Sequence, residues 1–445
     1  MAKNYSGLSL GVLSCKAFFA RAKNAGKTFS RLFQESAKLL FTYQIPIKNT
    51  TYYYNASKLK KRNISVKTMS TQEQIYVATC LFGLEKLVGE ELDALGCKRL
   101  ETIDGRVRFI APLDWIPRLN INLRFAERLL LEVGRCPAPD FDTLFEGVRS
   151  MPWEAYIGKK DAFPVKGHSI KSRLVSLPDC QRIIKKAAAR RLGAAYGLEL
   201  LPETDAKYQI EFFILKDTAS LMIDTSGTAL HKRGYRPIAT EAPLRETLAA
   251  ALAKIARPRE DVLFRDPMCG SGTIAIEAAM IMTNTAPGIN RSFASEQFAW
   301  LAPEVWENAR DEAFDAIADT DFEAYASDIS PDAVKIASEN VRRAGMAKHI
   351  RVFSEDALKI QTEGRRGTIV CNPPYGERLA TVKEAEALYR AMGRHFATLD
   401  NWQIYILTSD DYFEKLYGRR ADNVRRLYNG MIKCNYYQFF KKSRK

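Results

Sequence analysis

Strand-like and helix-like segments alternate from residue 257 to residue 445, and this alternation constrains the fold more than any other feature. The alternation predicts a parallel sheet with helices on both faces. Asn429-Gly430 is a strong hairpin signal, so residues 425–428 and 431–440 are expected to close the sheet as an antiparallel pair. The short apolar runs that predict the parallel strands lie at 262–265, 323–327, 349–353, 367–371 and 403–408.

Two smaller α+β patterns precede this domain. The first has a strand at 75–79, a helix with apolar residues at 84, 87, 88, 92 and 95, and a strand at 105–110. The second has an extended segment at 163–172, a helix from 178 to about 195, and a hairpin of strands at 208–215 and 219–224. We therefore expect a unit over 69–135, a second unit over 136–229, a linker and helix over 230–256, and an α/β domain over 257–445.

Residues 1–68 differ from the rest of the chain in charge. They contain thirteen Lys or Arg residues and a single acid, Glu35, whereas the whole chain has 67 basic and 52 acidic residues. We expect a disordered basic leader upstream of a working start at Met69; a basic arm that adds phosphate contacts and an organellar targeting segment are the alternatives. Because most of the net charge of +15 lies in this segment, any nucleic-acid site elsewhere must be a local patch.

Composition excludes several protein classes. No apolar run approaches the length of about 20 residues that a membrane-spanning helix needs, so no membrane partner is expected. The 8 Cys and 4 His residues are scattered without a Cys-x-x-Cys pair, so the sequence predicts neither a metal site nor a disulfide framework. Reduced thiols favour a cytoplasmic location.

A glycine-containing loop follows the first predicted strand of the α/β domain. Asp266-Pro-Met-Cys-Gly-Ser-Gly-Thr273 opens a helix. Its glycines allow a tight turn, and free N–H groups at the helix start favour an anionic group. The loop is not a Walker A motif, because no Gly-Lys-Ser/Thr follows, and it lacks the third glycine of a dinucleotide fingerprint. It therefore indicates a ligand-binding turn of another class.

Two further acids follow strands of the same predicted sheet. Asp328 ends the second strand, where a ribose-binding carboxylate is expected. An insertion at about 284–320, with a polar helix over 304–318, separates it from the glycine loop. Asp356 follows the third strand and is a candidate partner for an adenine amino group. A single acid at a strand end is usually a solvent-exposed turn residue, but three acids at successive strand ends of one sheet favour a binding site instead.

The most specific motif is Asn372-Pro373-Pro374-Tyr375, directly after the strand at 367–371. Two prolines stiffen the backbone and fix the direction of the neighbouring carbonyls. The Asn372 side-chain oxygen and the Pro373 carbonyl can together accept both hydrogens of an amino group, and Tyr375 supplies a ring for a stacked base. The motif predicts a site that holds the exocyclic amine of a nucleobase so that its nitrogen attacks an electrophilic methyl group.

Together, Asp266–Thr273 and Asn372–Arg378 resemble the class I S-adenosylmethionine-dependent amino-group methyltransferases. Four further segments narrow the resemblance to the THUMP-domain RNA methyltransferases, close to the bacterial branch related to the 23S rRNA guanine-N2 methyltransferase. These segments are residues 230–236, 242–251, 286–288 and 429–430. It runs from Ile75 to Phe440. The resemblance implies a ferredoxin-like unit, a THUMP RNA-binding domain and a Rossmann-like class I methyltransferase domain.

The resemblance also implies a cofactor and its site. The cofactor is expected to be S-adenosylmethionine, with no metal. The residues 354–356 lack the Gly-Asp that the family often has there, and residues 1–68 have no counterpart. Cofactor binding is expected from Asp266, Met268, Cys269, Gly270, Gly272, Asp328, Ile329, Asp356 and Ala357, and catalysis from Asn372, Pro373, Pro374 and Tyr375.

A basic helical face offers a local patch for RNA. Arg182, Lys185, Lys186 and Arg190 lie along one side of the helix that begins near residue 178. An exposed basic face without a ligand is the alternative. Further basic residues lie on the preceding strand and in the linker, and the full set expected to contact RNA is Lys166, Lys171, Arg173, Arg182, Lys185, Lys186, Arg190, Lys232, Arg233 and Arg236.

These features predict a monomeric S-adenosylmethionine-dependent RNA methyltransferase that modifies the N2 amine of a guanine in large-subunit rRNA. Alternatives are a tRNA guanine-N2, DNA adenine-N6 or protein glutamine methyltransferase, and a non-catalytic RNA-binding assembly factor. A DNA enzyme usually needs a target-recognition domain, and a glutamine methyltransferase is not expected to carry an RNA-binding domain. The intact donor loop and Asn372 argue against a non-catalytic factor.

Overall fold

The computed structural model describes residues 72–237, 244–374 and 382–440. The predicted leader and Tyr375 lie outside these ranges, so the structure tests neither prediction. All the described elements belong to one compact unit. Among the helices in these ranges, none is long and apolar enough to cross a membrane. The same residues hold no group of three or more His, Cys, Asp or Glu side chains placed for a metal ion.

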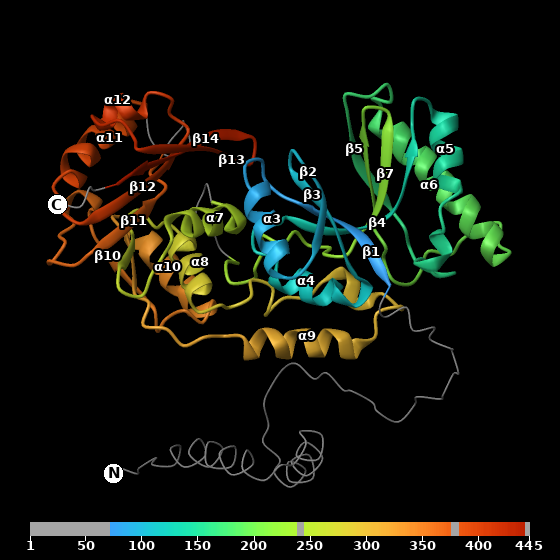
Figure 1. The fold of residues 1–445 in the computed structure, drawn as a ribbon, viewed down its shortest axis with the longest axis horizontal. Coiled ribbons are helices and arrows are strands. Elements are labelled where there is room, and N and C mark those ends of the chain that lie inside the picture. The colour runs from blue at the N-terminus through green and yellow to red at the C-terminus, as the bar shows by residue number, and fades with distance from the viewer. Residues whose placement is uncertain (1–71, 238–243, 375–381, 441–445) are drawn as a thin grey trace, which may run out of the picture. The chain divides into compact units, whose positions relative to one another are not determined.

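Residues 73–224 build one seven-stranded sheet, in the order β2-β3-β1-β4-β7-β6-β5 (Figure 1). β4 pairs antiparallel with β1 on one side and with β7 on the other. The two predicted α+β units therefore share one sheet, and the expected boundary at residues 135 and 136 falls inside β4. The strands are β1 (Glu73–Thr79), β2 (Lys98–Ile103), β3 (Arg106–Pro112), β4 (Arg128–Pro137), β5 (Val165–Ile170), β6 (Ile210–Leu215) and β7 (Thr218–Asp224).

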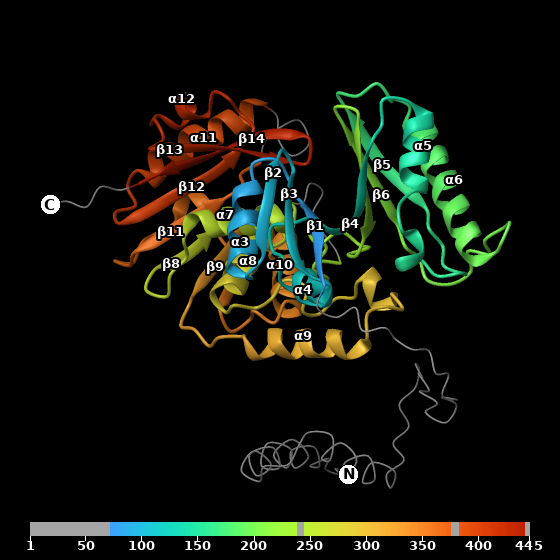
Figure 2. The same cartoon turned by 45° about the vertical axis from the view of Figure 1, so that its right-hand side comes forward.

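Four helices pack on this first sheet. α6 buries Ile184, Ala187 and Leu192, which recur at helical spacing, and it ends at Gly197, whose φ of 64° suits the left-handed cap. α5 and α6 lie side by side on one face of the strands that follow β4 (Figure 2). The sequence predicted α3 and α6 but neither α4, α5 nor β2. The helices are α3 (Glu85–Ala94), α4 (Ile116–Asn122), α5 (Phe141–Arg149) and α6 (Leu177–Tyr196).

The second sheet has the order β10-β9-β8-β11-β12-β14-β13. The first five strands are parallel, and β14 and β13 are antiparallel, as the sequence predicted. The chain runs outward from β8 to β10 and then returns to β11 beside β8, which makes a topological switch point between β8 and β11. The strands are β8 (Leu263–Asp266), β9 (Ala324–Asp328), β10 (Ile350–Ser354), β11 (Gly367–Cys371), β12 (Trp402–Thr408), β13 (Asn423–Asn429) and β14 (Ile432–Phe439).

Helices cover both faces of the second sheet. Val370 faces a core shared with α7, α8 and α10, whereas its neighbours Ile369 and Cys371 face a separate core with α11 and α12. This alternation follows from the two-residue period of a strand. The helices are α7 (Glu246–Ala256), α8 (Thr273–Met282), α10 (Pro331–Arg343), α11 (Val382–Phe396) and α12 (Phe413–Tyr417).

The insertion that follows α8 ties the two sheets together. Its helix α9 (Pro303–Asp315) lies against α4 (Figure 1), where Arg118 forms an ion pair with Glu312 at 3.2 Å. Phe298 of the insertion stacks on Tyr208 at a ring-centroid distance of 4.2 Å. The second sheet and the first sheet are therefore held together by side-chain packing as well as by the chain that links them.

Candidate methyl-donor and acceptor site

A pocket of about 490 Å³ lies at the carboxyl ends of β8, β9 and β11, at the switch point of the second sheet. This position is where open α/β sheets bind ligands. Pro373 is buried, but neither it nor Gly272 lines the pocket. The predicted site residues that do line it are Asp266, Met268, Cys269, Gly270, Asp328, Ile329, Asp356, Ala357, Asn372 and Pro374.

The glycine loop is held in a conformation that few other residues could adopt. Gly270 and Gly272 have φ values of 52° and 78°. A Cβ atom on Gly272 would lie 3.2 Å from the Cβ of Ala337 on α10. The amide of Asn340, also on α10, donates to the Ser271 carbonyl at 3.0 Å. The loop is thus fixed before any ligand binds.

Asp266 presents a buried carboxylate with one oxygen, Oδ1, that lacks a hydrogen-bond partner among the described residues. Its side chain is 1% exposed. Burial raises the pKa of Asp266 well above its ordinary value, and the nearby Asp328 raises it further. A buried carboxylate of this kind is stabilised by a cationic donor group.

Asp328 links the loop to the next helix. Its Oδ2 accepts from the Gly270 N–H at 2.9 Å, and its Oδ1 accepts from the Ser330 N–H at 3.0 Å. Each carboxylate oxygen can accept a second hydrogen bond, so two vicinal hydroxyls can still bind there. Ile329 beside it is 72% exposed at the pocket wall, where an apolar ring can cover it.

Asp356 lines the pocket even though its flanking motif departs from the family pattern. Its Oδ1 accepts from the Leu358 N–H at 2.9 Å and caps a short 3-10 turn (Ala357–Lys359). The preceding Glu355 pairs instead with the buried Arg265. Asp356 therefore keeps its second oxygen, Oδ2, for a ligand and for Lys359, whose Nζ lies 3.9 Å away.

Asn372 follows β11 directly and also points to a missing ligand. Its Oδ1 is buried and has no hydrogen-bond partner among the described residues. The next turn is held from outside, because the Tyr389 hydroxyl donates to the Pro374 carbonyl at 3.2 Å and lies 3.0 Å from the Thr408 Oγ1. The sequence analysis did not identify Tyr389, because this residue belongs to no motif and its place on an amphipathic helix is the one signal that the sequence gives for it.

Two of the predicted RNA contacts are wrong, because Arg233 and Arg236 belong to the interior. Arg233 is 4% exposed and donates to the Leu230 carbonyl at 2.6 Å. Arg236 pairs with Glu246 at 2.9 Å. Its guanidinium also donates to the Thr273 Oγ1 at 2.9 Å, at the start of α8. Buried guanidinium groups that are already paired leave no surface for a phosphate, and Arg236 instead supports the donor loop.

The remaining basic residues divide into paired and unpaired cations. Ion pairs join Lys166 to Glu211, Arg173 to Asp217, Arg182 to Asp179 and Lys185 to Glu203. Lys171, Lys186, Arg190 and Lys232 are exposed and have no ion pair with the described residues. Lys186 and Arg190 also line a groove of about 1420 Å³ beside α5 and α6. The free basic surface is therefore smaller than the sequence predicted, and two of its four residues line this groove.

Comparison with known proteins agrees with the geometry. Models described as an RlmL ferredoxin-like domain, a THUMP domain and an RMKL-like methyltransferase domain match residues 76–130, 138–224 and 233–438. A protein of Bacillus subtilis (strain 168) named "Putative RNA methyltransferase YpsC" is 44% identical over 373 residues, which cover 83% of this chain and 96% of that protein. The chain belongs to the RMKL-like methyltransferases that carry a THUMP domain. The predicted resemblance and fold class are confirmed.

Other relatives of this RMKL-like methyltransferase differ in length and in name. "Ribosomal RNA large subunit methyltransferase K/L" of Psychromonas ingrahamii is 32% identical over 79% of this chain, and this chain spans about half of its length, 48%. A solved structure described as "a putative methyltransferase complexed with SAH" has a TM-score of 0.79 and 40% identity, covering 84% of this chain and 100% of that one. Another, from Listeria monocytogenes, is described as a "predicted N6-adenine-specific DNA methylase", with a TM-score of 0.79 and 41% identity over 86% of this chain and 99% of that one.

The family assignment agrees with the site. RMKL-like methyltransferases use S-adenosylmethionine, as the sequence predicted. The residues present suit this donor. The pocket combines a buried carboxylate at Asp266 whose Oδ1 has no partner among the described residues, a carboxylate with spare acceptors at Asp328, and an exposed apolar side chain at Ile329.

Proposed function

We propose that this methyltransferase modifies the exocyclic N2 amine of a guanine in large-subunit rRNA. The observation that carries the proposal is the buried, unpartnered Oδ1 of Asn372, which lines the same pocket as the donor-binding acids. An amine with two hydrogens is the partner that such an acceptor lacks. The relatives named for large-subunit rRNA support the RNA class, although this chain spans only about half of their length.

The donor pocket would hold S-adenosylmethionine through three acids. Asp266 would accept from the amino group of the donor, Asp328 from the ribose hydroxyls, and Asp356 from the adenine amine. When bound, the donor supplies a methyl group on an already activated sulfonium. The protein therefore has to align the donor and the acceptor, and it needs no nucleophile of its own.

The acceptor site would act by orientation and polarisation. The Asn372 Oδ1 and the Pro373 carbonyl would accept the two amine hydrogens and so aim the nitrogen lone pair at the methyl group. Tyr375 remains a proposed stacking platform, because it lies outside the described residues. A guanine inside an RNA helix would have to be flipped out, and stacking worth about 1–3 kcal/mol would offset part of that cost.

RNA binding would rest on the groove beside α5 and α6. Lys186 and Arg190 are the basic residues there without an ion pair to the described residues, and contacts of this kind position an RNA without reading its bases. The groove belongs to the region that matches the THUMP domain model.

The decisive experiment compares modified nucleosides in wild-type and deletion strains by mass spectrometry. We expect loss of N2-methylguanosine from large-subunit rRNA and its restoration by purified protein with S-adenosylmethionine. Loss from tRNA instead would refute the rRNA assignment. Loss of N6-methyladenine from DNA, or of methylated glutamine from a protein, would refute the acceptor. Unchanged profiles in all these pools would refute the enzyme assignment.

A further inference from the structure

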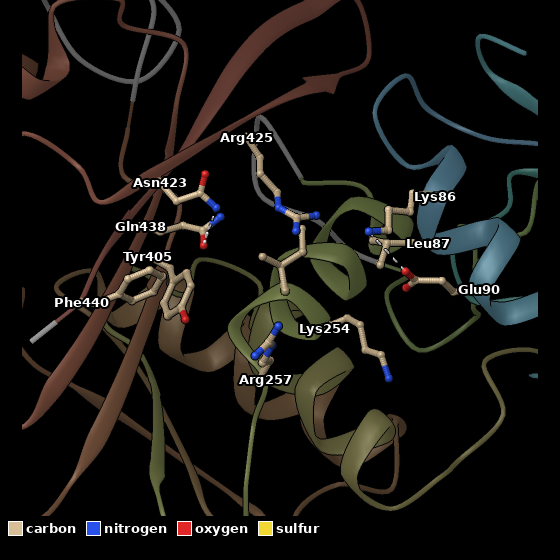
Figure 3. Close-up of a pocket in the computed structure, with 11 residues that line it drawn as sticks. Lys86, Leu87, Glu90, Lys254, Arg257, Tyr405, Asn423, Arg425, Gln438 and Phe440 are labelled. Carbon is tan, nitrogen blue, oxygen red and sulfur yellow. Dashed lines mark hydrogen bonds and ion pairs between the residues drawn. The ribbon is translucent and has the colours of Figure 1, made fainter.

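A second pocket, of about 530 Å³, lies between α3, the end of α7 and one face of the β12–β14–β13 sheet (Figure 3). It shares no lining residue with the donor pocket. The two are separated along α7, since Leu244, just before this helix, lines the donor pocket while Lys254 and Arg257, at its far end, line the second. Eleven helical residues span roughly 16 Å at 1.5 Å each.

The register of the sheet explains which residues face this pocket. Gln438 of β14 is paired with Tyr405 of β12 and with Asn423 of β13. Residues directly opposite one another in neighbouring strands share a face, and so does Arg425, two residues beyond Asn423. Figure 3 shows these side chains on one side of the pocket, with Lys254 and Arg257 of the α7 end across from them.

Cations dominate the pocket and are largely unpaired. Its charged residues are Lys86, Lys254, Arg257, Arg425 and a single acid, Glu90. Glu90 pairs with Lys86 at 3.7 Å, whereas Lys254, Arg257 and Arg425 form no ion pair with any described residue. Like charges gathered in this way repel one another unless an anion joins them. Elsewhere on the surface arginines meet acids, as Arg419 does with Asp422 at 2.7 Å.

A buried amide adds an independent sign of a missing ligand. Gln438 is 4% exposed. Its Oε1 accepts from the Asn423 amide at 3.5 Å, but its Nε2 donates to nothing among the described residues. A buried N–H₂ group without an acceptor is costly, and an anionic oxygen would satisfy it. An anionic ligand would therefore satisfy both the Gln438 amide and the three cations that have no ion pair with the described residues.

From these contacts we infer that the pocket binds a phosphate group of the RNA substrate, away from the target nucleotide. Cationic side chains would neutralise the charge, and the Gln438 amide would donate to a phosphate oxygen. This assignment of the phosphate to RNA rests on the proposed function. The same chemistry fits inorganic phosphate or a small phosphate compound, and the experiment separates these sources.

The test uses the full chain without S-adenosylmethionine. An amine-acylating reagent reports the accessibility of Lys254 by mass spectrometry, with rRNA from a deletion strain or inorganic phosphate as the added probe. We expect rRNA to protect Lys254 at concentrations near its dissociation constant. Protection by inorganic phosphate without protection by rRNA would overturn the RNA assignment, and absence of protection by either probe would overturn the pocket.

Charge removal supplies the second arm. Arg257→Asn and Arg425→Gln are combined, because Asn tolerates the φ of 54° at residue 257. At 0.1 M salt, rRNA binding should weaken about five- to tenfold per lost phosphate contact, and the salt slope should fall by about 0.7–0.9 per contact. Arg426→Gln is the matched control, because Arg426 is exposed on the same strand and does not line the pocket. Wild-type affinity and salt slope in the double variant would refute the inference.

Neither arm depends on methyl transfer. If rRNA protects Lys254 but is never methylated, the proposed function fails while the pocket stands. If the protein methylates rRNA while Lys254 stays fully accessible, the pocket fails alone. Melting temperatures of all variants establish that lost binding does not reflect lost folding, and Gln438→Glu, which keeps the size of the side chain and reverses its chemistry, should abolish protection.

Discussion

Replacing Asn372 by Ala should separate catalysis from folding. The Asn372 Oδ1 makes no hydrogen bond with the described residues, so its removal breaks no such contact and also eliminates a buried unsatisfied acceptor. We therefore expect the melting temperature to remain unchanged or to rise. Turnover should fall about 10²–10³-fold, or about 2.7–4 kcal/mol, which is the usual loss for one preorganised polar contact to the transition state.

The assay is single-turnover methylation of rRNA from a deletion strain, with donor affinity measured by calorimetry and stability by thermal unfolding. Asn340→Ala is the matched control, since its buried amide holds the Ser271 carbonyl. That variant should lose about 1–3 kcal/mol of stability and bind the donor more weakly. Near-normal turnover by Asn372→Ala would refute the acceptor site, and a large loss of its stability would refute the claim that Oδ1 is kept free for a ligand.

Three further predictions follow from other contacts. Tyr389→Phe removes the hydrogen bond to the Pro374 carbonyl and should lower turnover about tenfold with unchanged donor affinity, as single-turnover kinetics and calorimetry will show. Lys186→Glu with Arg190→Glu should weaken RNA binding and reduce its salt slope by about one unit per contact, measured by salt titration. Burial raises the pKa of Glu91 from 4.5 to about 7. The protonated side chain therefore stabilises the fold below pH 4.5, and this stabilisation is lost as the pH rises through 7. The melting temperature of Glu91→Gln, measured relative to that of the wild type, should therefore rise between pH 5 and pH 8.

The sequence predicted the second sheet well because apolar runs and turns mark its strands. β2 escaped prediction because all its side chains except Ile103 are exposed, so that this edge strand lacks an apolar pattern. The neighbour relation of β8 and β11 also could not be read from the alternation, since any doubly wound order produces the same pattern.

Site residues could be predicted where they belong to a recognisable motif, but not where their partners are set by tertiary packing. Asp266 and Asn372 stand in motifs from which their proposed roles were predicted, and both line the same pocket. Arg233 and Arg236 looked like a basic linker, but their partners Glu277 and Glu246 come from helices whose packing the sequence does not reveal. Gln438 has no motif, so only the structure shows that its amide is left without a partner.

The shared strand β4 has a consequence for how a substrate is chosen. Because β4 pairs with both β1 and β7, the groove-bearing helices and the ferredoxin-like strands are built on one continuous sheet, with no linker between them at which to hinge. The insertion after α8 in turn packs the second sheet against this first sheet. If RNA binds at the groove, a fixed length of RNA therefore separates the bound segment from the target base. We expect a one-base-pair insertion between the bound RNA helix and the target base to abolish methylation of an otherwise intact RNA, because the insertion changes this distance.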